Sequence, residues 1–131
     1  MIYGIGTDIV EVGRIESSIE KFGNDFAERI LAESEMPRYL EANAEGRIKA
    51  RFLAKRFAAK EAFSKALGTG LREPATFQNI AVSHDDLGKP ILVLARELQG
   101  LLAEKGINNM HITISDEKNL AAAFVVLETL D

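Results

Sequence analysis

Two carboxylates and one lysine in this sequence are of the types that can bind a metal ion and a phosphate together. Asp8 lies in an apolar stretch near the start of the chain, and Glu61 and Lys65 lie four residues apart in a later segment. Mg²⁺ typically takes one or two protein carboxylates and completes its shell with water and phosphate oxygens. If the fold brings Asp8 and Glu61 together, they have the composition of a magnesium site with a cation beside it.

Each of these residues also has an ordinary structural explanation. Asp8 could be a turn or capping acid, and Glu61 could form an exposed i, i+4 ion pair with Lys65, which adds roughly 0.2–0.5 kcal/mol to a helix. Gly68-Thr69-Gly70 follows, and its N–H groups and hydroxyl could approach a phosphate. Gly68 could equally be a plain helix C-cap. The residue types alone leave these alternatives open.

A basic segment surrounds the second carboxylate. Residues 47–65 contain seven lysines and arginines and a single acid, Glu61, although the whole chain has 16 basic and 20 acidic residues and a net charge of -4. The negative total argues against nucleic-acid binding. The basic segment could hold a phosphate-rich small molecule or form a solvated helix face.

Two elements must position this chemistry. Residues 1–12 mix β-branched and apolar side chains and predict a strand that carries Asp8, in which Gly4 and Gly6 permit close backbone approach. Residues 47–67 predict a long helix that ends at Gly68. Its apolar side chains share one broad face, with Glu61 nearly opposite.

Shorter elements fill the rest of the sequence. Helical spacing predicts helices over 14–22, 25–31, 34–42 (with Ser34 as a candidate cap) and 97–105, and alternation predicts strands over 77–83, 91–94, 110–115 and 120–127.

The order of these elements favours an α+β fold, with a mainly antiparallel sheet packed against a long helix. At 131 residues and 47% hydrophobic composition, the chain is expected to form one domain over 1–131. The last strand is apolar on both faces, so a helix or a subunit interface must cover each face.

Composition excludes several classes of protein. The chain has no cysteine, which excludes disulfides, thiolate metal sites and a cysteine nucleophile and fits a reducing compartment. The N-terminus lacks the pattern of a signal peptide, and no apolar run approaches the roughly 20 residues that span a bilayer. We therefore expect a cytoplasmic protein that binds neither membrane nor nucleic acid.

Two motifs carry a resemblance to a known family. Residues 4–11, Gly-Ile-Gly-Thr-Asp-Ile-Val-Glu, followed by Arg14-Ile15, resemble the N-terminal signature of bacterial holo-acyl-carrier-protein synthases. Residues 56–66, Arg-Phe-Ala-Ala-Lys-Glu-Ala-Phe-Ser-Lys-Ala, resemble the more specific phosphopantetheinyl transferase motif. Gly68-Thr69-Gly70 and Leu87-Gly88-Lys89-Pro90 also occur where this family has them, so the resemblance spans nearly the whole chain.

The resemblance implies the 4′-phosphopantetheinyl transferase fold and a reaction. Phosphopantetheine would pass from coenzyme A to a serine of apo acyl carrier protein, in support of fatty acid biosynthesis. Asp8 and Glu61 would bind Mg²⁺ with the coenzyme A pyrophosphate, Lys65 would neutralise phosphate charge, and Glu61 or a water would take the serine proton. Further residues match positions near coenzyme A, each of which could instead be structural: Arg56, Ser64, Gly68, Thr69, Gly70 and Pro90.

Acyl carrier proteins are strongly acidic, so docking requires a positive surface. Arg14, Lys21 and Arg29 on the N-terminal helices resemble the family's docking surface, and Phe26 could supply an apolar contact. These four residues could also be ordinary helix surface or core.

The sequence departs from the family at one place. Many relatives carry a histidine after the penultimate strand, whereas this chain has Asp116, so any phosphate contact of that histidine is in doubt here. His111 on the same strand is not an obvious substitute and is expected to be structural.

The resemblance also implies a homotrimer with active sites between subunits, where Asp8 and Glu61 could meet across an interface. Two other functions use the same residues. One is a non-catalytic module that binds carrier protein or nucleotide, which the complete set of Asp8, Glu61 and Lys65 disfavours. The other is a magnesium-dependent phosphohydrolase, which would release its product to water.

Overall fold

The computed structural model describes residues 1–41 and 46–130. These residues form five strands, five α-helices and two short 3₁₀ helices. In chain order the elements are β1 (Ile2–Glu11), α1 (Val12–Phe22), α2 (Asn24–Ile30), η1 (Glu33–Glu35), α3 (Met36–Glu41), α4 (Gly46–Leu67), η2 (Phe77–Asn79), β2 (Ile80–His84), β3 (Pro90–Leu94), α5 (Arg96–Glu104), β4 (Asn109–Asp116) and β5 (Leu120–Glu128).

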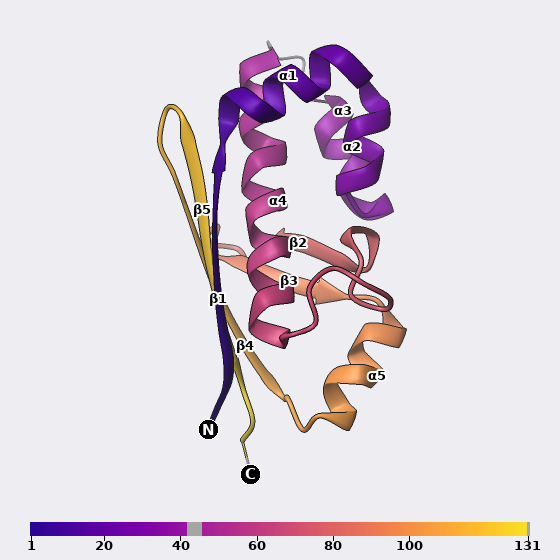
Figure 1. Cartoon of the computed structure of the whole chain (residues 1–131), viewed down its shortest axis with the longest axis vertical. Helices are drawn as coiled ribbons and strands as arrows, with labels where there is room; N and C mark the ends of the chain where they lie inside the picture. The colour runs from indigo at the N-terminus through magenta and orange to yellow at the C-terminus, as the bar shows by residue number, and fades with distance from the viewer. Residues whose placement is uncertain (42–45, 131) are drawn as a thin grey trace.

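Helix α4 lies along one face of an antiparallel sheet. The sheet has the strand order β1-β5-β4, and β2 and β3 form a separate hairpin that crosses behind α4 in Figure 1, with β3 in contact with β4. Helices α1 to α3 gather at one end of α4, and α5 lies at the other end beside β3 and β4. The predicted α+β fold, a mainly antiparallel sheet against a long helix, is confirmed.

Strand β1 touches α4 directly, without intervening side chains. A Cβ atom added to Gly4 would lie 2.0 Å from the carbonyl oxygen of Ala66, and one added to Gly6 would lie 2.0 Å from the carbonyl oxygen of Ala62. Any side chain larger than hydrogen at these two positions would therefore push the strand away from the helix. The glycines set the spacing between β1 and α4.

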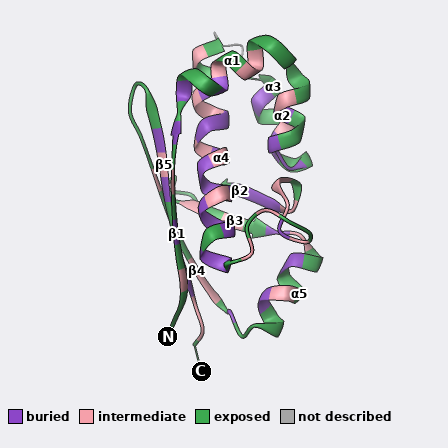
Figure 2. Cartoon of the chain, viewed as in Figure 1, coloured by how far each residue is buried: buried purple, intermediate pink, exposed green. Residues whose placement is uncertain are grey.

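The sheet buries only one of its two faces. The β5 side chains that face α4, such as Val125 and Leu127, are fully buried. On the opposite face Ile5, Ile9 and Phe124 are 58%, 68% and 43% exposed (Figure 2). We expected both faces of the last strand to be covered. Within the chain, α4 covers one face of β5, and the opposite face remains exposed.

Local predictions differ from the structure in two places. The strand expected from residue 77 begins at Ile80, because Phe77–Asn79 forms η2, in which the Phe77 carbonyl accepts a hydrogen bond from Lys60. Ser34 is not a helix cap. The N-cap of η1 is Ala32, whose N–H donates to the Glu35 carboxylate at 2.7 Å. The predicted end of the third helix at Ala42 lies outside the described residues.

None of the helices in residues 1–41 and 46–130 is both long enough and apolar enough to cross a bilayer.

Candidate active site

The strand-helix contact brings Asp8 to α4. Side chains alternate along a strand, so Asp8 shares the α4-facing side with Gly4 and Gly6. Two strand residues span roughly 6.6 Å and four helix residues roughly 6 Å. Gly4 faces Ala66 and Gly6 faces Ala62, so Asp8 comes level with Ala58, and the charge of Asp8 acts on Glu61 in that turn of α4.

Lys65 binds the strand and not its helical neighbour. Its Nζ donates to the Thr7 carbonyl at 2.9 Å and to the Asp8 carboxylate at 3.2 Å. Within the described residues no ion pair under 4.0 Å joins Lys65 to Glu61. The alternative of a simple i, i+4 pair is therefore wrong, and the lysine instead belongs to a three-residue cluster that spans two elements of one chain.

The environment of Glu61, including the Asp8 carboxylate, favours its neutral form. Partial burial raises the pKa of Glu61 above its ordinary value, the nearby Asp8 carboxylate raises it further, and Lys65 opposes both effects. A cation is therefore favoured beside this pair of acids. No group of three or more metal-ligating side chains occurs in the described part of the chain. Two carboxylates nevertheless fit Mg²⁺, which commonly takes one or two and leaves its other positions to water and phosphate.

The glycine loop after α4 is held by Ser64. The Ser64 carbonyl accepts hydrogen bonds from Gly68 N–H at 3.0 Å and Gly70 N–H at 3.3 Å. The Ser64 side chain is buried, and its hydroxyl donates to the Glu61 carbonyl at 2.8 Å. The Thr69 hydroxyl donates to the Gly70 carbonyl. In this structure the N–H groups of Gly68 and Gly70 therefore close the helix end, contrary to the suggestion that they are free to approach a phosphate.

Arg56 and Pro90 line one cavity of about 150 Å³, together with Lys55 and His84. A second cavity, of about 320 Å³, shares Arg56 and His84 with the first and is also lined by Arg38 and Glu35. Burial lowers the pKa of His84, and the charges of Arg56, Arg38 and Lys55 lower it further. These cavities, which we call the basic cavities, are suited to a phosphate.

A buried charge network holds Arg56 in place, and the sequence analysis did not find it. Lys60 is fully buried and donates to Glu35 at 2.5 Å and to the Ile30 carbonyl at 2.7 Å. Arg56 lies 3.5 Å from Glu35, stacks 3.6 Å from the Phe52 ring centre, and has no hydrogen-bond partner for its buried Nε. Burial lowers the pKa of Arg56 to about 10. No periodic signal could have revealed this network, because lysine and arginine normally lie on a helix surface.

The basic cavities and the carboxylates lie on different sides of α4. Arg56 and Glu61 are five residues apart, which separates them by about 140° around a helix. The residues that line the basic cavities include neither Asp8 nor Glu61. One chain therefore places the predicted site residues at two separate positions around α4.

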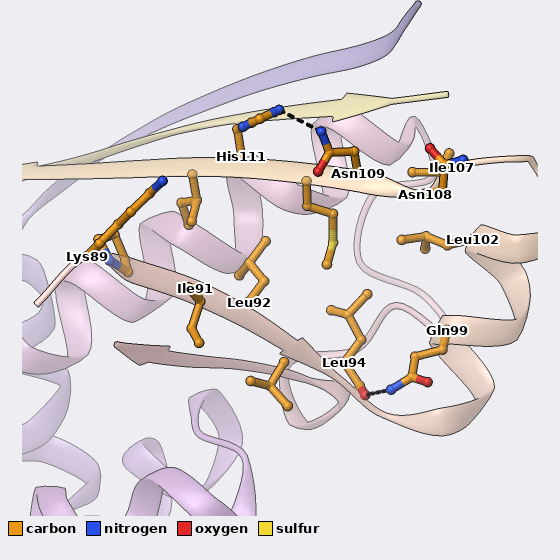
Figure 3. A pocket seen from close by; sticks show the side chains of 14 residues that line it. Lys89, Ile91, Leu92, Leu94, Gln99, Leu102, Ile107, Asn108, Asn109 and His111 are labelled. Atoms are coloured by element: carbon orange, nitrogen blue, oxygen red, sulfur yellow. Dashed lines mark hydrogen bonds between the residues drawn. The ribbon is translucent and has the colours of Figure 1, made fainter. Parts of the chain in front are cut away.

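A third cavity, of about 550 Å³, lies between β3, β4 and α5. Leu92, Leu94 and Leu102 surround its interior, and Lys89 lies at one end (Figure 3). Pro90 is the only predicted site residue among those that line it in the described chain. None of the residues of the carboxylate cluster lines this cavity.

The predicted docking residues divide into two kinds. Arg14, Lys21 and Arg29 are exposed on α1 and α2, whereas Phe26 is half-buried and packs against the core. Phe22, at the end of α1, is 43% exposed.

Asp116 accepts a hydrogen bond from Arg51 of α4 at 2.7 Å. The acid that stands where many relatives have histidine thus ties β4 to the basic part of α4. His111 forms a 2.6 Å contact with Glu128 on the exposed sheet face, which fits the expected structural role.

Comparison with known proteins gives a consistent result. The model of the 4′-phosphopantetheinyl transferase superfamily matches residues 4–125. The holo-[acyl-carrier-protein] synthase of Nitrosomonas europaea is 57% identical over 98% of this chain and 99% of its own length, and that of Vibrio parahaemolyticus is 48% identical over 98% of each.

Solved structures of proteins with the same name are also similar to this chain. The crystal structure of the Neisseria meningitidis holo-[acyl-carrier-protein] synthase has a TM-score of 0.91 at 48% identity, covering 98% of this chain and 99% of that one. The Bacillus anthracis synthase in complex with coenzyme A (3′,5′-ADP) has a TM-score of 0.81 at 43% identity, covering 99% of each chain.

Proposed function

We propose that this chain, which belongs to the 4′-phosphopantetheinyl transferase superfamily, transfers 4′-phosphopantetheine from coenzyme A to a serine of apo acyl carrier protein, in support of fatty acid biosynthesis. The single observation that carries this function is the cluster of Asp8, Glu61 and Lys65, built by the glycine contact between β1 and α4. Residues 1–131 would form a single domain, and the cytoplasmic location expected from the sequence remains a prediction.

Asp8 and Glu61 are the residues that would hold Mg²⁺. When bound, the ion would neutralise charge on the pyrophosphate oxygens. Lys65 adds a fixed positive charge beside the phosphates, and its bond to Asp8 keeps its ammonium group in the cluster. Phosphoryl transfer depends mainly on positioning and charge stabilisation. The two carboxylates with their ion, together with Lys65, are therefore sufficient without an enzyme nucleophile.

The atoms balance in a single displacement. The serine oxygen forms a bond to the β-phosphorus of coenzyme A, and the bond from that phosphorus to the oxygen of adenosine 3′,5′-bisphosphate breaks. Glu61, whose pKa is raised, accepts the serine proton directly or through a water that it orients.

Coenzyme A requires more phosphate contacts than the carboxylate cluster offers. We assign the basic cavities, with Arg56 and Pro90, to its remaining charged groups. Arg56, Arg38 and Lys55, which line these cavities and whose charges act on His84, support this assignment. Gly68, Thr69 and Gly70 flank Lys65 and contribute to the substrate site through the shape of their loop, which Ser64 supports from beneath.

A homotrimer would unite the two halves of the site. The carboxylate cluster of one chain would face the basic cavities of its neighbour, so that coenzyme A lies between subunits. Asp8 and Glu61 themselves meet within one chain. The exposed apolar sheet face around Ile5, Ile9 and Phe124 supports self-association.

The reaction is tested by incubating the protein with coenzyme A, Mg²⁺ and apo carrier protein and weighing the carrier. A gain of the phosphopantetheine mass is expected. Release of pantetheine phosphate without carrier modification would indicate a phosphohydrolase, and no reaction would indicate a binding module. Glu61→Gln should abolish most of the gain while folding normally, with the exposed Glu33→Gln as the matched control.

Assembly is tested separately by light scattering. The wild-type protein is expected to have the mass of three chains, and Ile9→Asp, on the exposed apolar face, is expected to run as a smaller species. A wild-type monomer that retains full activity would refute the shared site.

A further inference from the structure

We propose that His84 is a specificity residue for coenzyme A, whose imidazolium form binds the 3′-phosphate of the nucleotide in the basic cavities. This inference rests on the proposed function and adds one residue, and one proton, to its coenzyme A site. It predicts a preference for coenzyme A over 3′-dephospho-coenzyme A that weakens as the pH rises.

His84 lies where the two basic cavities meet. It lines both of them, as Arg56 does. It is the last residue of β2, and its partner across the antiparallel hairpin is Pro90, the first residue of β3. Side chains of directly opposed residues project to the same face of such a pair. His84 is therefore on the Pro90 side of the hairpin, where the proposed function places coenzyme A.

Three cations act on the imidazole of His84. Arg56 and Lys55 come from α4, and Arg38 comes from α3. Burial lowers the pKa of His84 below its ordinary 6.5, and the three positive charges lower it further. A phosphate dianion among these cations would have the opposite effect, because a nearby negative charge favours the imidazolium. Binding of the phosphate should therefore add a proton to His84.

The carboxylates near His84 have partners of their own. Asp116 lines the smaller cavity and accepts a hydrogen bond from α4 at 2.7 Å. Glu35 lines the larger cavity and accepts a hydrogen bond from the buried Lys60. Asp85 accepts hydrogen bonds from two N–H groups of its own turn and favours the imidazolium only as a minor influence. Within residues 1–41 and 46–130 no ion pair under 4.0 Å joins His84 to a carboxylate, so a phosphate would not have to displace one.

The 3′-phosphate is the group of coenzyme A that suits this position. The proposed function assigns the pyrophosphate to the carboxylate cluster, and no residue of that cluster lines the basic cavities. The 3′-phosphate is a monoester with a second pKa of about 6, so it carries mostly two negative charges at neutral pH. Hydrogen bonds between ionised groups are roughly twice as strong as those between neutral groups. The imidazolium of His84 would therefore distinguish coenzyme A from a nucleotide without this phosphate.

This assignment also bears on Asp116, which stands where many relatives have histidine. His84 and Asp116 belong to different strands, β2 and β4, yet they line the same cavity. The phosphate contact that is in doubt at residue 116 is thus available to an imidazole from β2.

The test is a cycle of two proteins and two ligands. Wild type and His84→Gln are titrated by calorimetry with coenzyme A and with 3′-dephospho-coenzyme A, in the presence of Mg²⁺ and without carrier protein, between about pH 6.5 and 8.5. At the lower pH the wild type should bind coenzyme A about tenfold more tightly than His84→Gln does. This advantage should disappear at the higher pH, because His84 loses its proton. The dissociation constant of 3′-dephospho-coenzyme A should be the same for both proteins throughout.

Two further variants serve as controls. His84→Lys carries a permanent cation, so it should bind coenzyme A tightly at both ends of the pH range. His111→Gln removes the other histidine of the chain, which contacts Glu128 outside the basic cavities, and it should keep the pH dependence of the wild type. Because His84 is exposed, its variants should melt at the temperature of the wild type.

The proposal is wrong if coenzyme A binds His84→Gln as tightly as the wild type at the lower pH. It is also wrong if 3′-dephospho-coenzyme A shows the same dependence on pH and on His84 as coenzyme A, or if His84→Lys keeps that pH dependence. A wild type that binds coenzyme A as predicted but does not modify the carrier would refute the proposed function and leave the role of His84 intact. Transfer by a wild type whose preference for coenzyme A does not change with pH would do the reverse, and a wild type that does not bind coenzyme A would refute both.

Discussion

Gly6 should be indispensable because it sets the distance between Asp8 and Glu61. In Gly6→Ala the new Cβ would lie 2.0 Å from the Ala62 carbonyl oxygen and 2.7 Å from the Ala66 nitrogen. Both neighbours are helix backbone, which cannot rotate out of the way. Since ordinary contact begins near 3.4 Å, β1 must move away from α4 by about 1.4 Å, the difference between an ordinary contact and the built one.

This displacement has two measurable consequences. Overpacking of this kind typically costs about 1–3 kcal/mol of unfolding free energy. Asp8 lies two residues further along the same strand face, so its 3.2 Å contact with Lys65 would open to as much as about 4.6 Å if the strand moves as a unit. Misplacement of reacting groups by about 1 Å can reduce the rate about a hundredfold.

The assay compares Gly6→Ala with Gly100→Ala, in the middle of α5, where a Cβ would meet nothing within 4 Å. Urea unfolding should show a loss of stability for Gly6→Ala and a gain of about 0.5–1 kcal/mol for Gly100→Ala. Transfer to carrier protein, measured at saturating substrates, should fall about a hundredfold in the first variant alone. A Gly6→Ala protein with wild-type stability and turnover would refute the spacing role of the glycine.

Three further perturbations have defined outcomes. Asp8→Ala should raise the Mg²⁺ concentration needed for half-maximal transfer, measured by metal titration, because the remaining carboxylate is a poorer site; an unchanged requirement would argue against the assignment. Glu35→Gln should lower the unfolding free energy by about 3–5 kcal/mol, since it leaves the buried Lys60 charge unpaired; an unchanged urea midpoint would contradict the charge network. Glu128 has a pKa below its ordinary 4.5, chiefly through its hydrogen bond with His111, so its stabilisation is present above that pH and is lost as the pH falls. Melting temperatures between pH 3 and 6 should therefore depend on pH less in Glu128→Gln than in the wild type.

Lys65 illustrates how far the sequence reached into the site. Its spacing from Glu61 correctly put both side chains on the same part of α4, away from the core-facing residues. The sequence could not choose between a pair with Glu61 and a pair with a residue on another element. The structure gives the pair with Asp8, because β1 lies against α4 at glycine-to-backbone distance.

The burial of Lys60 and the exposure of Phe22 both differ from what their local sequence pattern indicates. Lys60 belongs to a basic segment and reads as surface, yet it is fully buried because Glu35 and two carbonyls satisfy its charge and its hydrogens. Phe22 has the helical spacing of the apolar residues Ile15 and Ile19 of α1, yet it is 43% exposed.

The amino-acid sequence by itself determined the order of helices and strands, the strand that carries Asp8, and the family to which the chain belongs. Those properties follow from local periodicity and from motifs, which are fixed along the chain. Only the tertiary structure decided which charge meets which, that Arg56 and Glu61 lie on different sides of α4, and which aromatic ring of the N-terminal helices is exposed. Contacts between distant segments depend on how whole elements pack, and no spacing within one element records that packing.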